Sequence, residues 1–171
     1  MSGPDRSESF EALRDLADAR YGDWCSRELR SESDSRFAEL NKKRLTSGRA
    51  LHALRITQEL LTRKVRKRIS IYHSVARKKH SEEMLSKPRL GEFRESIMRS
   101  VGASLSSLSS RTLRQASAVG YPQSALPNEL RYDHVRAEIL TIINTALAKL
   151  RAEGEAHSGM PDGSDAAPGF R

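Results

Sequence analysis

Residues 35–80 constrain the fold most, because they combine the longest uninterrupted helical pattern of the chain with a dense set of basic side chains. The segment contains no proline, and it contains no glycine after Gly48. A helix interior tolerates these two residues least, at about 3 and 1 kcal/mol relative to alanine. The sequence therefore predicts one long helix over about 35–80, and any kink in it is expected at Ser47–Gly48.

The apolar residues of this segment form two lines. Successive residues of an α-helix are 100° apart, so residues three or four positions apart share a face. The broader line comprises Leu51, Leu54, Gln58, Leu61, Val65, Ile69, Tyr72 and Ala76, and the sparser line on the opposite side comprises Ile56, Leu60 and Ile71. A helix that is apolar on two sides needs two neighbours. Because the broader line has the near-heptad spacing of a coiled coil, the second neighbour is either another helix of this chain or a second copy of it.

The rest of the chain predicts three more helices and a tail. Asp5 and Glu8 have the spacing of a capping box before the first helix, and the run Ser31–Ser35 is rich in cap formers and predicts a turn. After Gly154 the composition of Gly, Ser, Asp, Pro and Ala predicts disorder. The predicted helices span about 6–30, 35–80, 89–119 and 128–153, in one domain over 1–153 that precedes a disordered tail over 154–171.

The predicted fold class is all-α. Aromatic residues make up only 5% of the chain and charged residues 30%, which favours helices packed through Leu, Ile and Ala over a β-sandwich. Short connections between four helices predict a bundle in which neighbours are antiparallel. We therefore expect a four-helix bundle-like domain with one long basic helix at its centre.

The net charge of +8 is concentrated in the long helix. Residues 35–80 carry 14 Lys and Arg against two acids, whereas residues 1–34 carry five basic and nine acidic side chains. Two explanations follow from this distribution. The basic side chains form a surface for a polyanion, or acids of the first helix such as Asp15 and Asp18 neutralise them.

The candidate nucleic-acid contacts are the basic residues that lie between the two apolar lines on the helical wheel, together with the basic cluster at residues 63–68. Three of them, Arg55, Arg66 and Arg77, repeat every eleven residues, which places them about 16 Å apart along one edge of a helix. The full candidate set is Arg55, Arg63, Lys64, Arg66, Lys67, Arg68, Arg77 and Lys78.

The sequence carries no pattern that predicts catalysis, a metal site or a cofactor. His73 and His80 are too far apart on a helix to share a metal ion, and Asp133 and His134 point about 100° apart, which prevents a catalytic dyad. The single cysteine, Cys25, is typical of a reducing compartment. No apolar run has the length of a signal peptide core or a membrane span, so we expect a cytoplasmic protein. Because the sequence carries no catalytic pattern, we also expect the protein to be non-enzymatic.

Two functions from different classes remain after these exclusions. The first is binding of a nucleic acid or a ribonucleoprotein, in which Lys and Arg side chains hold phosphates without reading bases. The alternative is an interaction module, an adaptor or accessory subunit that self-associates or binds a protein partner through the long helix. The same charge is also explained without any binding function, by a helix face that is solvated or neutralised within the protein.

Overall fold

The computed structural model describes residues 9–42, 46–118, 120–121 and 123–158, and every regular element in these ranges is helical. The prediction of an all-α fold is confirmed. The elements are α1 (Phe10–Trp24), the π-helical turn η1 (Cys25–Leu29), α2 (Arg30–Asn41), α3 (Ser47–Lys78), α4 (Glu82–Leu85), α5 (Lys87–Ala118), the 3-10 turns η2 (Gln123–Ala125) and η3 (Asn128–Leu130), and α6 (Tyr132–Ser158).

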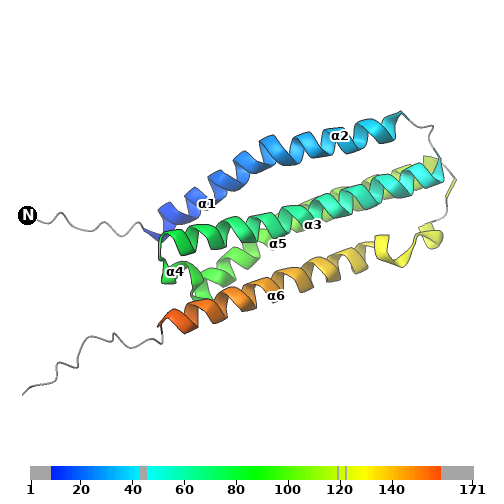
Figure 1. Cartoon of the computed structure of the whole chain (residues 1–171). Helices are drawn as coiled ribbons and strands as arrows, with labels where there is room; N and C mark the ends of the chain where they lie inside the picture. The colour runs from blue at the N-terminus through cyan, green and yellow to red at the C-terminus, as the bar shows by residue number, and fades with distance from the viewer. Residues whose placement is uncertain (1–8, 43–45, 119, 122, 159–171) are drawn as a thin grey trace, which may run out of the picture.

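Four long rods lie lengthwise in the molecule, and successive rods run in opposite directions (Figure 1). The first rod is formed by α1, η1 and α2 together. The other three are α3, α5 and α6. Helix α3 contacts all the other rods, and α5 also packs against α6, so the long basic helix is the central element of the bundle.

The first rod continues to Asn41, and the turn predicted at Ser31–Ser35 is wrong. The run Ser31–Ser35 is a poor helix former. The helix α2 that contains it nevertheless packs the apolar residues Phe37 and Leu40 against α3. Tertiary packing of that kind overrides weak local propensity. The rod starts at Phe10 with the Ser9 hydroxyl accepting a hydrogen bond from the Ala12 amide at 3.3 Å; the predicted cap at Asp5 lies outside the described residues.

The long central helix is therefore shorter than predicted. Residues 35–41 belong to the first rod, and α3 begins at Ser47, where the Thr46 hydroxyl accepts from the Arg49 amide at 3.1 Å. The expected weak point at Ser47–Gly48 is thus a helix start and not a kink. Helix α3 ends at Lys78, and His80 adopts φ 48° while the Ser81 amide donates to the Ala76 carbonyl at 2.9 Å, which is the geometry of a Schellman cap.

Both apolar lines of α3 are buried within one chain. The broader line forms the main core with the apolar stripes of α5 and α6, and Leu51 and Gln58 are its half-buried members. Ile56 and Leu60 of the sparser line pack with Leu40 and with partly buried Leu29 and Phe37 of the first rod. Ile71, the third residue of this line, is partly buried against the main core. The second neighbour of α3 is therefore the first rod of the same chain.

The last helix extends beyond its predicted end. Helix α6 reaches Ser158, so the predicted tail is wrong for residues 154–158; residues 159–171 lie outside the described ranges. It also begins at Tyr132 and not at 128, because the short turn η3 precedes it. Gly154 is buried against α4, a short helix that the sequence analysis missed. Helix α5 likewise begins two residues early, at Lys87, since proline is tolerated in a first turn.

A glycine-to-alanine substitution tests the contact between α6 and α4. A Cβ atom at Gly154 would lie 2.9 Å from the Leu85 Cβ and 3.2 Å from the Leu85 carbonyl oxygen. These atoms cannot rotate away. We expect Gly154→Ala to lower the free energy of unfolding by about 1 kcal/mol, since overpacking outweighs the gain in helix propensity. Chemical denaturation measures the change.

The matched control is Gly102→Ala in α5, where an added Cβ meets nothing within 4 Å. The same substitution is expected to stabilise the protein there by up to about 1 kcal/mol. Equal effects at both positions would contradict the close packing of Gly154 on Leu85.

Candidate nucleic-acid interface

The eight candidate basic residues lie on different sides of α3. Arg55, Arg63 and Arg66 line a groove of about 510 Å³, which is completed by Leu130 of η3 and Glu138 of α6. Lys64 lines a separate groove toward α5. Arg68 lies beside Asp18, Ser96 and Phe93, between α1 and α5. Packing of the neighbouring rods therefore separates side chains that are adjacent in sequence.

Arg63 and Lys67 contact the first rod. The Arg63 guanidinium forms an ion pair with Glu32, and its Cζ lies 5.9 Å from the centroid of the Trp24 ring. The Lys67 ammonium lies 5.7 Å from the same centroid. Trp24 is buried, and its indole N–H donates to Glu28 at 2.8 Å. Each cation–π contact contributes about 0.5–1 kcal/mol at a partly exposed site, so these two residues help to hold the rods together.

Arg68 is a structural residue in this fold. Its side chain is only 14% exposed, and its guanidinium donates to Asp18 at 3.2 Å and to the Ser96 hydroxyl at 3.0 Å. It also lies 5.4 Å from the Tyr21 ring centroid and 5.9 Å from that of Phe93. A phosphate cannot reach a guanidinium enclosed in this way, and we leave Arg68 out of the candidate interface.

Besides Arg63, four of the candidate residues are exposed: Arg55, Arg66, Arg77 and Lys78. The first three keep the eleven-residue spacing, since α3 is continuous from Ser47 to Lys78. Helix α3 carries nine Lys and Arg against Glu59 as its single acid. Glu59 is bound by Arg36, and Glu138 accepts a hydrogen bond from Gln58 at 3.2 Å. Arg77 lines a further groove together with Glu82 of α4 and Glu153 of α6.

The expected neutralisation by the first helix is present in part, but with different partners. Asp18 pairs with Arg68, whereas Asp15 lies 3.4 Å from Arg14 of its own helix. Glu32 replaces Asp15 as the partner of the basic helix. Because the sequence predicted a turn at 31–35, Glu32 was not expected on a helix that faces α3.

The other titratable residues considered in the sequence lie at separate places in the fold. His73 lies 2.7 Å from Glu153 of α6, which ties α3 to the last helix. Asp133 and His134 are exposed in the first turn of α6. Cys25 is half-buried, and the described residues contain no group of three or more His, Cys, Asp or Glu that could bind a metal ion. None of the described helices is both long enough and apolar enough to cross a bilayer.

Comparison of this chain with protein-family models, with curated proteins and with solved structures finds no match.

Proposed function

We propose that this chain is a non-enzymatic cytoplasmic protein that binds the phosphate backbone of a nucleic acid, free or in a ribonucleoprotein, through the exposed edge of α3. The interface consists of Arg55, Arg66 and Arg77, extended by Lys78. The observation that supports it is the line of three exposed arginines at an eleven-residue spacing on an unbroken helix.

The length of this line matches a nucleic-acid backbone. Arg55 and Arg77 are 22 residues apart, which is about 33 Å at the helical rise, and successive phosphates of one duplex strand are about 3.4 Å apart along the axis. Arg55 and Arg77, at the two ends of the line, therefore meet phosphates that are about ten base pairs apart. Contacts of this kind bind without reading sequence.

Replacing all three arginines tests the proposal. We expect Arg55→Gln, Arg66→Gln and Arg77→Gln together to weaken binding of duplex DNA and RNA oligonucleotides, because each phosphate contact releases condensed counterions. The slope of log affinity against log salt should decrease by about 0.9 for each arginine that no longer neutralises a duplex phosphate. Fluorescence anisotropy over a series of salt concentrations measures both quantities, and circular dichroism verifies that the helices are kept.

The matched control removes the same charge elsewhere. Arg20 of α1 and Arg99 and Arg114 of α5 are exposed and lie outside this edge. Their triple glutamine variant should keep the salt slope almost unchanged. If both triple variants lose the same affinity, general attraction to a basic protein explains the binding. If the unmodified protein binds no oligonucleotide at low salt, the proposal is wrong.

A further inference from the structure

A second groove lies along α3, between the first rod and α5. Its volume is about 610 Å³. Leu60 and Leu61 of α3 and Leu108 of α5 contribute apolar side chains to its base. Leu29 of the first rod lies along one wall, and Ala103 of α5 lies along the opposite one.

The charge around this groove has one sign. Arg30, Lys64 and Arg111 each line it from a different rod, and the described residues that line it include no Asp or Glu. Arg30 lies 3.9 Å from Asp34, and both side chains are at least 75% exposed. Ion pairs this exposed contribute little. The groove therefore presents an apolar base inside a basic rim.

The groove follows one face of α3 and one face of α5 for about two helical turns. Its lining residues on α3 run from Thr57 to Lys64 and those on α5 from Ala103 to Arg111, repeating at intervals of three and four. These runs extend about 11–12 Å, which is two helical turns. The α5 wall is made of small side chains, Ala103, Ser104 and Ser107, and small residues allow another backbone to approach closely.

We propose that this groove binds a short acidic amphipathic helix of a partner protein. Apolar side chains of that helix at positions i, i+3 or i+4, and i+7 occupy the base, as in other helix-in-groove complexes, while Asp or Glu side chains on its flanks meet Arg30, Lys64 and Arg111. This site is separate from the exposed arginine edge and adds a second interaction to the proposed function.

The only cysteine of the chain lies in the groove and provides a readout. Helix-forming peptides are selected from a displayed random library against the full chain, and the selected peptides are tested for slowing the alkylation of Cys25 by a maleimide. We expect peptides with a net negative charge and apolar residues at intervals of three and four, and we expect them to protect Cys25. Selection of peptides that lack this pattern, or that leave Cys25 alkylation unchanged, would overturn the proposal.

Two variants test the position and the charge of the site. Ser107→Trp fills the groove and is expected to abolish peptide binding, whereas Ser106→Trp, at an exposed α5 position outside the groove lining, is expected to preserve it. Lys64→Glu with Arg111→Glu should select peptides of the opposite charge. If this double variant selects the same acidic peptides, the rim does not choose the partner and the proposal fails. Protection of Cys25 by an oligonucleotide and by no peptide would assign the groove to nucleic acid and overturn the protein partner.

Discussion

Replacing Arg68 by glutamine is expected to lower the free energy of unfolding by about 2–3 kcal/mol and to leave nucleic-acid affinity unchanged. The substitution removes the hydrogen bonds to Asp18 and Ser96 and two interactions with aromatic rings. A hydrogen bond to a charged group contributes about 1.5–3 kcal/mol, but Asp18 is half exposed and its share is smaller for that reason. Each ring interaction adds about 0.5–1 kcal/mol.

Arg66→Gln is the control for Arg68→Gln, because it removes the same charge from an exposed position of the same helix. It should change stability by less than about 0.5 kcal/mol and weaken oligonucleotide binding. Denaturant unfolding and fluorescence anisotropy, measured on both variants, give four values to compare. The opposite pattern, with a stable Arg68 variant that binds poorly, would show that Arg68 contacts the nucleic acid.

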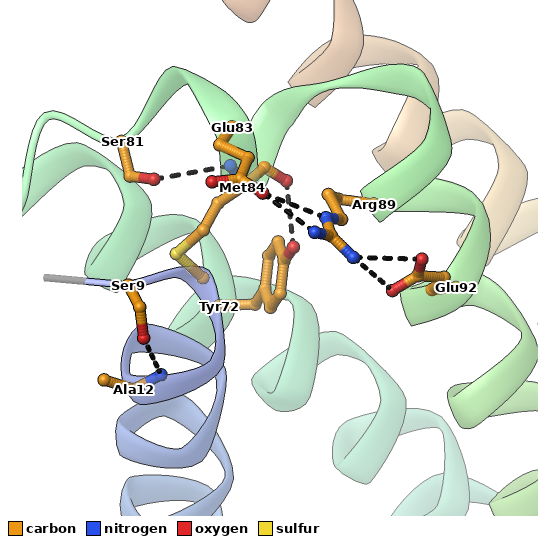
Figure 2. A network of polar contacts seen from close by, with 8 residues as sticks. All are labelled: Ser9, Ala12, Tyr72, Ser81, Glu83, Met84, Arg89 and Glu92. Atoms are coloured by element: carbon orange, nitrogen blue, oxygen red, sulfur yellow. Dashed lines mark hydrogen bonds and ion pairs between the residues drawn. The ribbon is translucent and has the colours of Figure 1, made fainter.

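Replacing Tyr72 by phenylalanine is expected to destabilise the protein by about 1–2 kcal/mol at neutral pH, and this difference should shrink as the pH rises above 10. The Tyr72 hydroxyl donates to the Met84 carbonyl at 2.8 Å (Figure 2), and both residues are almost completely buried. The variant leaves that carbonyl without its partner, which accounts for the cost at neutral pH. Tyr72 also stacks on Phe93, with ring centroids 3.9 Å apart, and phenylalanine preserves this contact.

The dependence on pH follows from the buried phenol. Burial raises the pKa of Tyr72 well above its ordinary value, and the nearby Glu92 adds to the effect. Above about pH 10 the phenol ionises in the unfolded chain while it stays neutral in the native protein. Through this group the free energy of unfolding of the unmodified protein therefore falls by about 1.4 kcal/mol for each pH unit above 10. The phenylalanine variant has no phenol at this position and does not show this loss.

Urea unfolding at pH 7, 9, 10 and 11 measures this difference between the two proteins. Burial also raises the pKa of Tyr21, but that residue is present in both and its effect cancels. Tyr132→Phe, at the exposed start of α6, should leave stability at neutral pH unchanged. A difference between the Tyr72 variant and the unmodified protein that stays constant or grows above pH 10 would contradict the buried, hydrogen-bonded phenol.

Periodicity was sufficient to predict the parts of the fold that depend on a single helix. The spacing of Leu54, Leu61, Val65 and Ile69 identified the buried face of α3, and these residues are in the main core. It could not show which element covers the other face. Ile56 and Leu60 are covered by residues 29–40, where local composition favoured a turn and packing formed a helix.

The candidate site shows the same division. Arg66 and Arg68 are two residues apart on one helix, and the helical wheel places them on different sides of it. Whether a side is exposed depends on Asp18 and Ser96 of two other rods, and no pattern within the long helix contains that information. The helical wheel therefore gives the direction of each side chain around α3, while the environment of each side chain required the assembled bundle.

The π-helical turn η1 determines which way the second half of the first rod faces. Trp24 lies against the basic cluster of α3, and the next inward residue, Leu29, follows after five positions instead of the usual three or four. A π-turn accommodates one extra residue in a helix, and one residue rotates everything beyond it by about 100°. The π-turn absorbs that rotation and keeps Phe37 and Leu40 turned toward α3. Loss of one residue between Trp24 and Leu29 would therefore convert the turn into regular α-helix and leave the same side chains facing α3, whereas loss of one residue between Leu29 and Phe37 would turn Phe37 and Leu40 away.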